Sequence, residues 1–239
     1  MKKIYLLSLL LFACQAVPEK KSNPPVLDLQ DQTPVSVWDD NLKGFLALGD
    51  SYTIGEAVAE NMRWPNQLVE KWNANEPAYN SAEIIARTGW TTDELSNALE
   101  QTPPKRPSYD KVSLLIGVNN QYRGRSSVAF EEELIELIER AIVYAGNDPS
   151  RVFVVSIPDW GVMPFAEGRD REEIALQIDA FNAVVRRQAV AFEIDFIDVT
   201  PISREATNNS RLVASDGLHP SGYQYTLWAN TIFNTLENN

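Results

Sequence analysis

Short apolar runs rich in β-branched residues alternate with longer stretches of helical periodicity along most of this chain. The runs are bounded by polar or turn-forming residues and have the length of strands, so they predict buried strands. They lie at residues 45–48, 83–86, 112–116, 152–157 and 194–199.

Between the predicted strands, apolar residues recur at the spacing of one face of a helix. One such set is Phe130, Leu134, Leu137, Ile138, Ala141 and Ile142, and another is Ile174, Ile178, Phe181 and Val185. Thr91 with Glu94, and Asp170 with Glu173, have the spacing of capping boxes that start helices. These stripes predict core-facing helices and imply no cofactor.

Strand and helix alternate about five times, which predicts an α/β fold: a three-layer α/β/α sandwich around a five-stranded parallel sheet. Residues 44–239 show no internal repeat and no second change of composition, so they are expected to form one domain. In such sheets ligands bind beyond the carboxyl ends of the strands. The loops that follow the strands are therefore where chemistry is expected.

The first 14 residues predict an export signal, with Lys2 and Lys3 ahead of an apolar run too short for a stable membrane anchor. The run ends at Cys14 and resembles a bacterial lipoprotein signal, in which the cysteine carries the lipid. A secreted protein whose ordinary signal contains a cysteine is the alternative. Residues 15–43 are polar and broken by four prolines, and they predict a tether.

Composition and charge narrow the classes of function. The chain is 44% hydrophobic and 23% charged, as in globular proteins, and its formal charge of −12 argues against a nucleic-acid partner. Cys14 is the only cysteine, so an internal disulfide and a cysteine-based metal site are excluded. We expect no cofactor, a location in the cell envelope, and membrane contact only through the lipid on Cys14.

Ser51, in "GFLALGDSYTIGE", follows the first predicted strand and precedes a helical segment. Free backbone N–H groups at such a helix start favour developing negative charge, as an attacked ester requires. A serine at this place more often makes a turn or a cap. The segment is not the Gly-x-Ser-x-Gly elbow of the α/β-hydrolases, because Asp50 precedes Ser51 and the next glycine is Gly55.

A serine nucleophile needs a general base, and the chain contains one histidine, His219, in "SDGLHPSGY". Asp216 lies three residues earlier in the same glycine- and proline-rich loop, where its carboxylate can orient the imidazole ring. The alternatives are a histidine without a catalytic role and an ordinary Asp-Gly turn.

Two further loops that follow predicted strands carry candidate donors for an oxyanion. Gly89, in "ARTGWTTDEL", allows close approach of a backbone N–H, and Asn119, in "LLIGVNNQYRG", offers a neutral side-chain donor. Taken singly, a loop glycine and a loop asparagine are more often structural.

Together, Gly49-Asp50-Ser51, Gly89, Gly117-Val118-Asn119 and Asp216-x-x-His219 resemble, in order, the four blocks of the SGNH, or GDSL-type, hydrolase family. The resemblance implies a flavodoxin-like sheet, Ser51 as nucleophile, His219 as base and Asp216 as its orienter. It also implies an oxyanion hole formed by the backbone N–H groups of Ser51 and Gly89 and the side chain of Asn119. Asn120 departs from the commoner aspartate at a position that is not catalytic.

The sequence therefore predicts a serine esterase that acts on a small-molecule or glycan ester, preferably a short-chain or carbohydrate O-acetyl ester. A lysophospholipase or thioesterase, and a non-catalytic surface-anchored binding protein of the same fold, are the alternatives. Trp90, Tyr122, Arg123 and Trp160 are candidate substrate-binding residues, although loop aromatics mostly pack and a solvated arginine is a common alternative.

Overall fold

A computed structural model describes residues 38–238 of the protein. The predicted export signal, Cys14 and all but the last residues of the predicted tether lie outside the described residues. Residues 39–43 contact the folded domain, where Lys43 N–H donates to the Ala78 carbonyl and Asn80 N–H to the Lys43 carbonyl. None of the helices in the described part is both long and apolar enough to span a membrane.

The centre of the fold is a five-stranded sheet in which every pairing is parallel. Its order is β2-β1-β3-β4-β5, the flavodoxin-like order that the family resemblance implies. The strands are β1 (Phe45–Gly49), β2 (Glu83–Ala86), β3 (Lys111–Leu115), β4 (Val152–Val155) and β5 (Asp195–Ile197). The α/β prediction and all five strands are confirmed, although the last two are shorter than their apolar runs.

The apolar runs extend beyond the ends of β4 and β5 because the chain there stops pairing with neighbouring strands but remains buried. The Ser156 hydroxyl, directly after β4, accepts hydrogen bonds from the backbone N–H groups of Val199 and Thr200, at 2.8 and 3.1 Å. These bonds replace ladder partners. Hydrophobicity reports burial and not pairing, so the pattern overestimates strand length.

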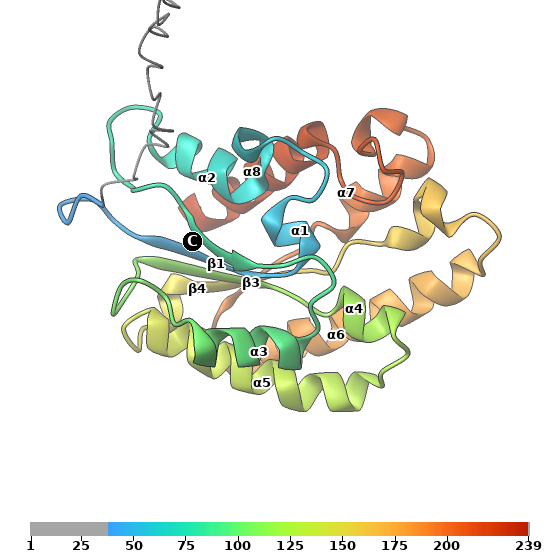
Figure 1. The fold of residues 1–239 in the computed structure, drawn as a ribbon, viewed down its shortest axis with the longest axis horizontal. Coiled ribbons are helices and arrows are strands. Elements are labelled where there is room, and N and C mark those ends of the chain that lie inside the picture. Colours follow the sequence, from blue (N-terminus) through green and yellow to red (C-terminus); the bar gives the residue numbers. More distant parts are fainter. Residues whose placement is uncertain (1–37, 239) are drawn as a thin grey trace, which may run out of the picture. The chain divides into compact units, whose positions relative to one another are not determined.

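Helices cover both faces of the sheet (Figure 1), with α2 and α8 on one side and α3, α5 and α6 on the other. The α-helices are α1 (Ser51–Ile54), α2 (Trp64–Trp72), α3 (Thr92–Gln101), α4 (Val118–Tyr122), α5 (Ser127–Tyr144), α6 (Arg171–Ala191), α7 (Thr200–Arg204) and α8 (Gly222–Glu237). Short 3₁₀ turns are η1 (Glu60–Met62), η2 (Pro149–Arg151), η3 (Trp160–Val162), η4 (Pro164–Ala166), η5 (Glu205–Thr207) and η6 (Ser210–Leu212).

The predicted helical stripes are the buried faces of α5 and α6. Phe130 of α5 and Phe181 of α6 are buried, with ring centroids 4.8 Å apart. The capping box of Thr91 and Glu94 forms at the start of α3. At α6 half of the predicted box forms: the Asp170 side chain accepts from the Glu173 N–H, whereas the Glu173 carboxylate accepts from Gln177.

The strand order places the topological switch point between β1 and β3, since the chain moves from β1 outward to β2 and then returns past β1 to β3. Adjacent strands there diverge into loops on opposite sides, which leaves a crevice at their carboxyl ends. Ser51 is the first residue of α1, which follows β1, and Asn119 is the second residue of α4, which follows β3. The fold alone therefore brings these two side chains to one edge.

Candidate active site

Ser51 lies in a tight turn where β1 passes into α1. Gly49 allows this turn, because a Cβ atom there would lie 2.2 Å from the Thr53 hydroxyl and 2.3 Å from the Leu115 carbonyl oxygen. Asp50 caps α1 by accepting from the Tyr52 N–H at 3.0 Å. Ser51 is 5% exposed and opens onto a pocket at the carboxyl edge of the sheet.

His219 and Asp216 form a hydrogen-bonded pair in the loop before α8. The Asp216 Oδ2 atom lies 2.6 Å from His219 Nδ1, and Oδ1 accepts from the backbone N–H groups of Leu218 and His219 at 2.9 and 3.0 Å. Burial alone would raise the pKa of Asp216, but the hydrogen bonds from the His219 ring and the two backbone groups hold it below its usual value. An ionised Asp216 fixes the ring with Nδ1 as donor, which leaves Nε2 for another partner.

The His219 ring lines the same pocket as Ser51. Its other face contacts Tyr52, with ring centroids 5.7 Å apart in an edge-to-face arrangement. Within residues 38–238 no hydrogen bond joins the Ser51 hydroxyl to His219. Nucleophile and base are frequently not in full contact until substrate binds.

Gly89, in the loop after β2, and Asn119, in α4 after β3, also line this pocket. Gly89 has φ +88°, a left-handed conformation that disfavours residues with a side chain, although a Cβ there would meet only Arg123 Nη2, at 3.9 Å. Asn119 Nδ2 donates to the Trp90 carbonyl at 2.9 Å, which fixes the amide and leaves its second N–H free.

Arg123 joins the loop that carries Gly89 to α4, the helix that carries Asn119. It follows α4, and its Nη2 atom donates to the Gly89 carbonyl at 2.7 Å and lies 3.2 Å from the Glu94 carboxylate. Glu94 in turn accepts from the Thr91 N–H at 2.9 Å within the capping box of α3. The guanidinium is thus engaged with the protein, and the arrangement holds the Gly89 loop against α4.

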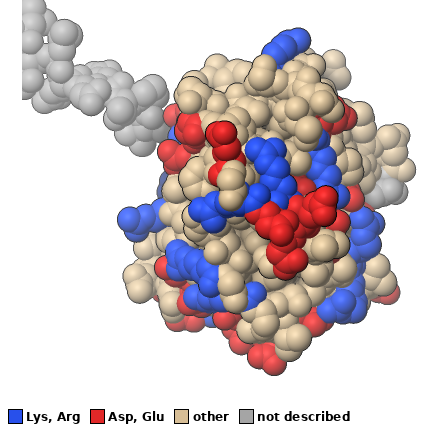
Figure 2. Space-filling view, turned by 90° about the vertical axis from the view of Figure 1, so that its right-hand side faces the viewer, with Lys and Arg blue, Asp and Glu red and all other residues tan. Residues whose placement is uncertain are grey.

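Acidic and basic side chains gather in adjoining groups on the face where the strands end, as seen from the right-hand side of Figure 1 (Figure 2). Among the ion pairs of the described chain, Arg125 pairs with Asp93 at 2.7 Å, and Arg204 with the buried carboxylate of Asp159 at 2.9 Å.

The pocket has a volume of about 180 Å³ and a mostly apolar lining. It is lined by Ser51, Tyr52, Thr88, Gly89, Val118, Asn119, Tyr122, Trp160, Phe165, Leu218 and His219. Of the candidate substrate-binding residues, Tyr122 and Trp160 lie in this wall. The half-buried Trp90 packs against the core and contributes its carbonyl to Asn119.

Asp50 is a buried carboxyl group next to Ser51, and the sequence analysis assigns it no role. Burial raises the pKa of Asp50 from 3.8 to about 7, against the opposing hydrogen bond from the Tyr52 N–H. Its Oδ2 atom has no hydrogen-bond partner within the described chain. Sequence motifs do not reveal such a residue, because the burial that raises its pKa arises only when the turn packs beneath α8.

The sequence analysis also misses the lining residues Tyr52, Thr88, Phe165 and Leu218. Phe165 lies in η4, within the segment "SIPDWGVMPFA" at residues 156–166 that directly follows β4, and Leu218 lies between Asp216 and His219. The sequence signal that could have found them is their position beyond a predicted strand. Within residues 38–238 no group of three or more His, Cys, Asp or Glu side chains is arranged to hold a metal ion.

Comparison with solved structures shows the same fold in known esterases and lipolytic proteins. The acetylxylan esterase Axe2 from Geobacillus stearothermophilus aligns with a TM-score of 0.63 and 18% identity, over 81% of this chain and 94% of that one. The esterase EstA from Pseudoalteromonas sp. aligns with a TM-score of 0.61 and 16% identity, over 82% and 97% of the two chains.

A lipolytic protein of the G-D-S-L family from Veillonella parvula aligns with a TM-score of 0.62 and 19% identity, over 82% of this chain and 99% of that one. At these identities the likeness shows the fold alone. Comparison with curated proteins finds no match. The model of the GDSL-like lipase/acylhydrolase family matches residues 47–227, which include all four motif blocks, and the chain belongs to that hydrolase family.

Proposed function

We propose that the protein is a serine esterase that cleaves carboxylic esters through an acyl-enzyme. Ser51 is the nucleophile, His219 the general base and Asp216 the residue that orients it. The observation that carries the proposal is the 2.6 Å bond between Asp216 and the only histidine of the chain, in a pocket shared with Ser51. A binding protein has no need for this combination.

The reaction follows from this arrangement. The Ser51 Oγ atom attacks the ester carbonyl carbon while its proton passes to His219 Nε2, and the carbonyl oxygen becomes an oxyanion. The N–H groups of Ser51 and Gly89 and the amide of Asn119 stabilise that charge. The tetrahedral intermediate then loses the alcohol, which takes the proton from His219. Water repeats the cycle on the acyl-enzyme and releases the acid.

We propose a short acyl group, with carbohydrate O-acetyl esters as the preferred class. Sites for drug-sized ligands usually have several hundred Å³, whereas this pocket has about 180 Å³. Its aromatic walls, Tyr122 and Trp160, suit an acetyl group and the adjoining part of a sugar. A lysophospholipase or thioesterase requires room for a long acyl chain, so we rank that function second.

A panel of p-nitrophenyl esters from acetate to palmitate, run beside acetylated oligosaccharides, tests this proposal. We expect acetate to be turned over best and the Asp216→Ala variant to be strongly impaired on every ester. Preferred cleavage of long-chain esters would favour the lysophospholipase or thioesterase alternative. Wild-type protein that binds sugars and hydrolyses no ester would instead be a binding protein.

We further propose export to the cell envelope with Cys14 as the site of lipid attachment, supported by the position of the only cysteine at the end of the apolar run. Labelled palmitate should be incorporated into wild-type protein and not into a Cys14→Ser variant, which should be released in soluble form. Wild-type protein without lipid would leave an ordinary secretory signal as the explanation.

A further inference from the structure

Arg169 lies between η4 and α6, with its guanidinium held against three aromatic rings. Its Cζ atom is 5.3, 5.4 and 5.5 Å from the ring centroids of Tyr122, Trp160 and Phe165. Its Nη2 atom donates to the Tyr122 hydroxyl at 3.2 Å. Stacking on rings orients a guanidinium and leaves its other N–H groups free to donate in the plane.

The same three rings line the catalytic pocket with Ser51 and His219. Tyr122 and Trp160 also line an open groove of about 420 Å³ that includes Arg169. The two rings therefore form a wall shared by pocket and groove. A substrate whose acyl group occupies the 180 Å³ pocket has to extend its remaining part out of it, and the groove gives that part a path past Arg169.

Hydrogen bonds hold the Trp160 side of this wall in place. Trp160 Nε1 donates to Gln121 Oε1 at 2.8 Å, and Gln121 Nε2 donates to Gln177 Oε1 at 2.6 Å. Gln177 Nε2 then donates to the Glu173 carboxylate at 2.7 Å. This chain of hydrogen bonds fixes the Trp160 ring on which Arg169 rests, and it engages one of the two acids of the groove.

Arg169 forms no ion pair within residues 38–238, unlike three other arginines near the carboxyl edge of the sheet. Arg123, Arg125 and Arg204 each pair with a carboxylate at 3.2 Å or less. The other acid of the groove, Asp170, accepts from the Glu173 N–H as the cap of α6. A fixed guanidinium without an acidic partner is therefore available at the edge of the pocket, in a chain of formal charge −12.

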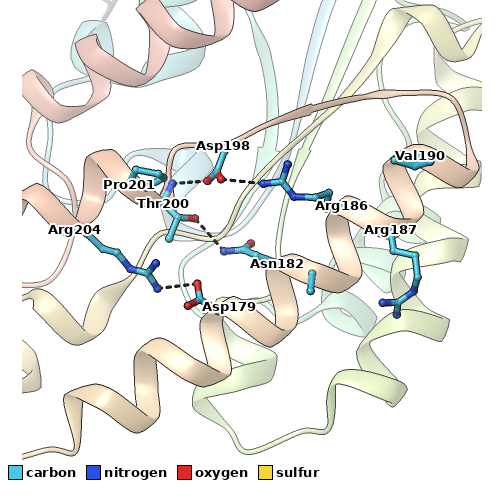
Figure 3. Close-up of a pocket in the computed structure, with 10 residues that line it drawn as sticks. Asp179, Asn182, Arg186, Arg187, Val190, Asp198, Thr200, Pro201 and Arg204 are labelled. Atoms are coloured by element: carbon cyan, nitrogen blue, oxygen red, sulfur yellow. Dashed lines mark hydrogen bonds and ion pairs between the residues drawn. The ribbon is translucent and has the colours of Figure 1, made fainter.

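A second cavity, about 500 Å³ in volume and lined by α6, α7 and the end of β5, provides a contrast (Figure 3). Its arginines are engaged: Arg186 pairs with Asp198 at 3.0 Å and Arg204 with Asp179 at 2.8 Å. An anion entering there has to displace a carboxylate. The charge argument that favours anion binding at Arg169 therefore does not favour anion binding in this cavity.

We propose that Arg169 binds an anionic group, a carboxylate or a phosphate, on the alcohol portion of the ester. The proposal rests on the esterase function above and adds a charge to its substrate. The planar guanidinium matches the two oxygens of such a group and can bind both. The proposal predicts that the protein prefers anionic esters to neutral esters of the same shape.

Matched aryl acetates test the proposal. The anionic members are 3- and 4-acetoxybenzoate and 4-acetoxyphenyl phosphate, and the neutral members are phenyl acetate and the methyl esters of the two benzoates. We expect Arg169→Gln to lower kcat/KM about tenfold for at least one anionic ester and to leave every neutral ester within about twofold, the effect of losing a charge-assisted hydrogen bond. High salt should reduce the preference of the wild type and have little effect on the variant.

Arg171→Gln is the matched control, because it removes the same charge two residues away. The Arg171 guanidinium donates to the backbone carbonyls of Val162 and Met163, at 3.4 and 3.3 Å. We expect this variant to keep the wild-type preference for anionic esters. An equal loss in both variants would mean a general effect of charge and would overturn the proposal.

Two further outcomes separate this proposal from the one on which it rests. Parallel loss on neutral and anionic esters in Arg169→Gln would make Arg169 a support for the rings and would overturn anion recognition. Wild-type protein that hydrolyses neutral acetates but shows no Arg169-dependent preference for anionic esters would also overturn anion recognition. The esterase function would then stand. A wild-type protein that hydrolyses no acetate at all would contradict the esterase function itself. The phosphate and carboxylate members show which anion the site prefers.

Discussion

Replacing Asp50 by asparagine is expected to change how the stability of the protein depends on pH. The Asp50 carboxyl group is fully buried and accepts one backbone hydrogen bond from Tyr52, and its Oδ2 atom has no partner among residues 38–238. Desolvation disfavours its ionised form and raises its pKa from 3.8 to about 7. Asparagine has nearly the same shape, keeps an oxygen for the Tyr52 N–H and carries no charge.

The size and direction of the effect follow from linkage. Because the pKa is raised in the folded state, the bound proton stabilises the fold fully below about pH 4, and this contribution is lost as pH rises through 7. A rise from 3.8 to about 7 corresponds to about 4 kcal/mol, at 1.36 kcal/mol for each pH unit. The wild type should therefore lose stability relative to Asp50→Asn as pH rises from about 4 to 8.

Urea denaturation of both proteins at several pH values measures this difference, and subtraction cancels the titration of all other groups. The free energy of unfolding of Asp50→Asn, minus that of the wild type, should grow by several kcal/mol between about pH 4 and 8. Asp40→Asn, at an exposed position, is the control and should show little change. A difference that stays constant with pH, or that falls, would refute the reasoning.

Three predictions concern the catalytic groups. Asn119→Ala should lower kcat about a hundredfold or more, the usual cost of losing one oxyanion donor, and an unchanged kcat in ester hydrolysis would remove Asn119 from the site. Arg123→Met should lower kcat about tenfold with little change in KM, because the Gly89 loop loses its bond to α4, and Arg125→Met serves as the control. Asp216→Asn should lower kcat by about 10² to 10⁴, since the ring loses the carboxylate that orients it; wild-type kinetics would contradict its role.

The strands and the positions of the candidate site residues can be predicted from the sequence because both depend on local patterns in a fixed order. Apolar runs marked the five strands, and parallel order then required the loops after them to meet at one edge. The motif blocks carry their own geometry: Gly49 permits the turn at Ser51, and Asp216 lies on the same loop as His219. These features do not need knowledge of distant side chains.

The roles of the arginines could not be predicted in this way. Arg123 and Arg169 are both loop arginines near aromatic residues, and nothing in the sequence separates them. In the folded protein Arg123 is engaged by the Gly89 carbonyl and Glu94, whereas Arg169 stacks on rings from two distant segments. Whether a given arginine pairs with a carboxylate therefore depends on tertiary contacts.

Reaction with a fluorophosphonate, followed by intact-mass measurement and peptide mapping, tests the central claim most directly. This reagent phosphonylates a serine only where a base and an oxyanion site activate it, so the measurement is independent of the natural substrate. We predict one phosphonyl group on Ser51 of the wild-type protein, none on Ser51→Ala, and much slower labelling of His219→Ala. Hydrolysis of acetate esters by a wild-type protein that stays unlabelled, or that is labelled at another residue, would contradict the assignment of Ser51 as the nucleophile.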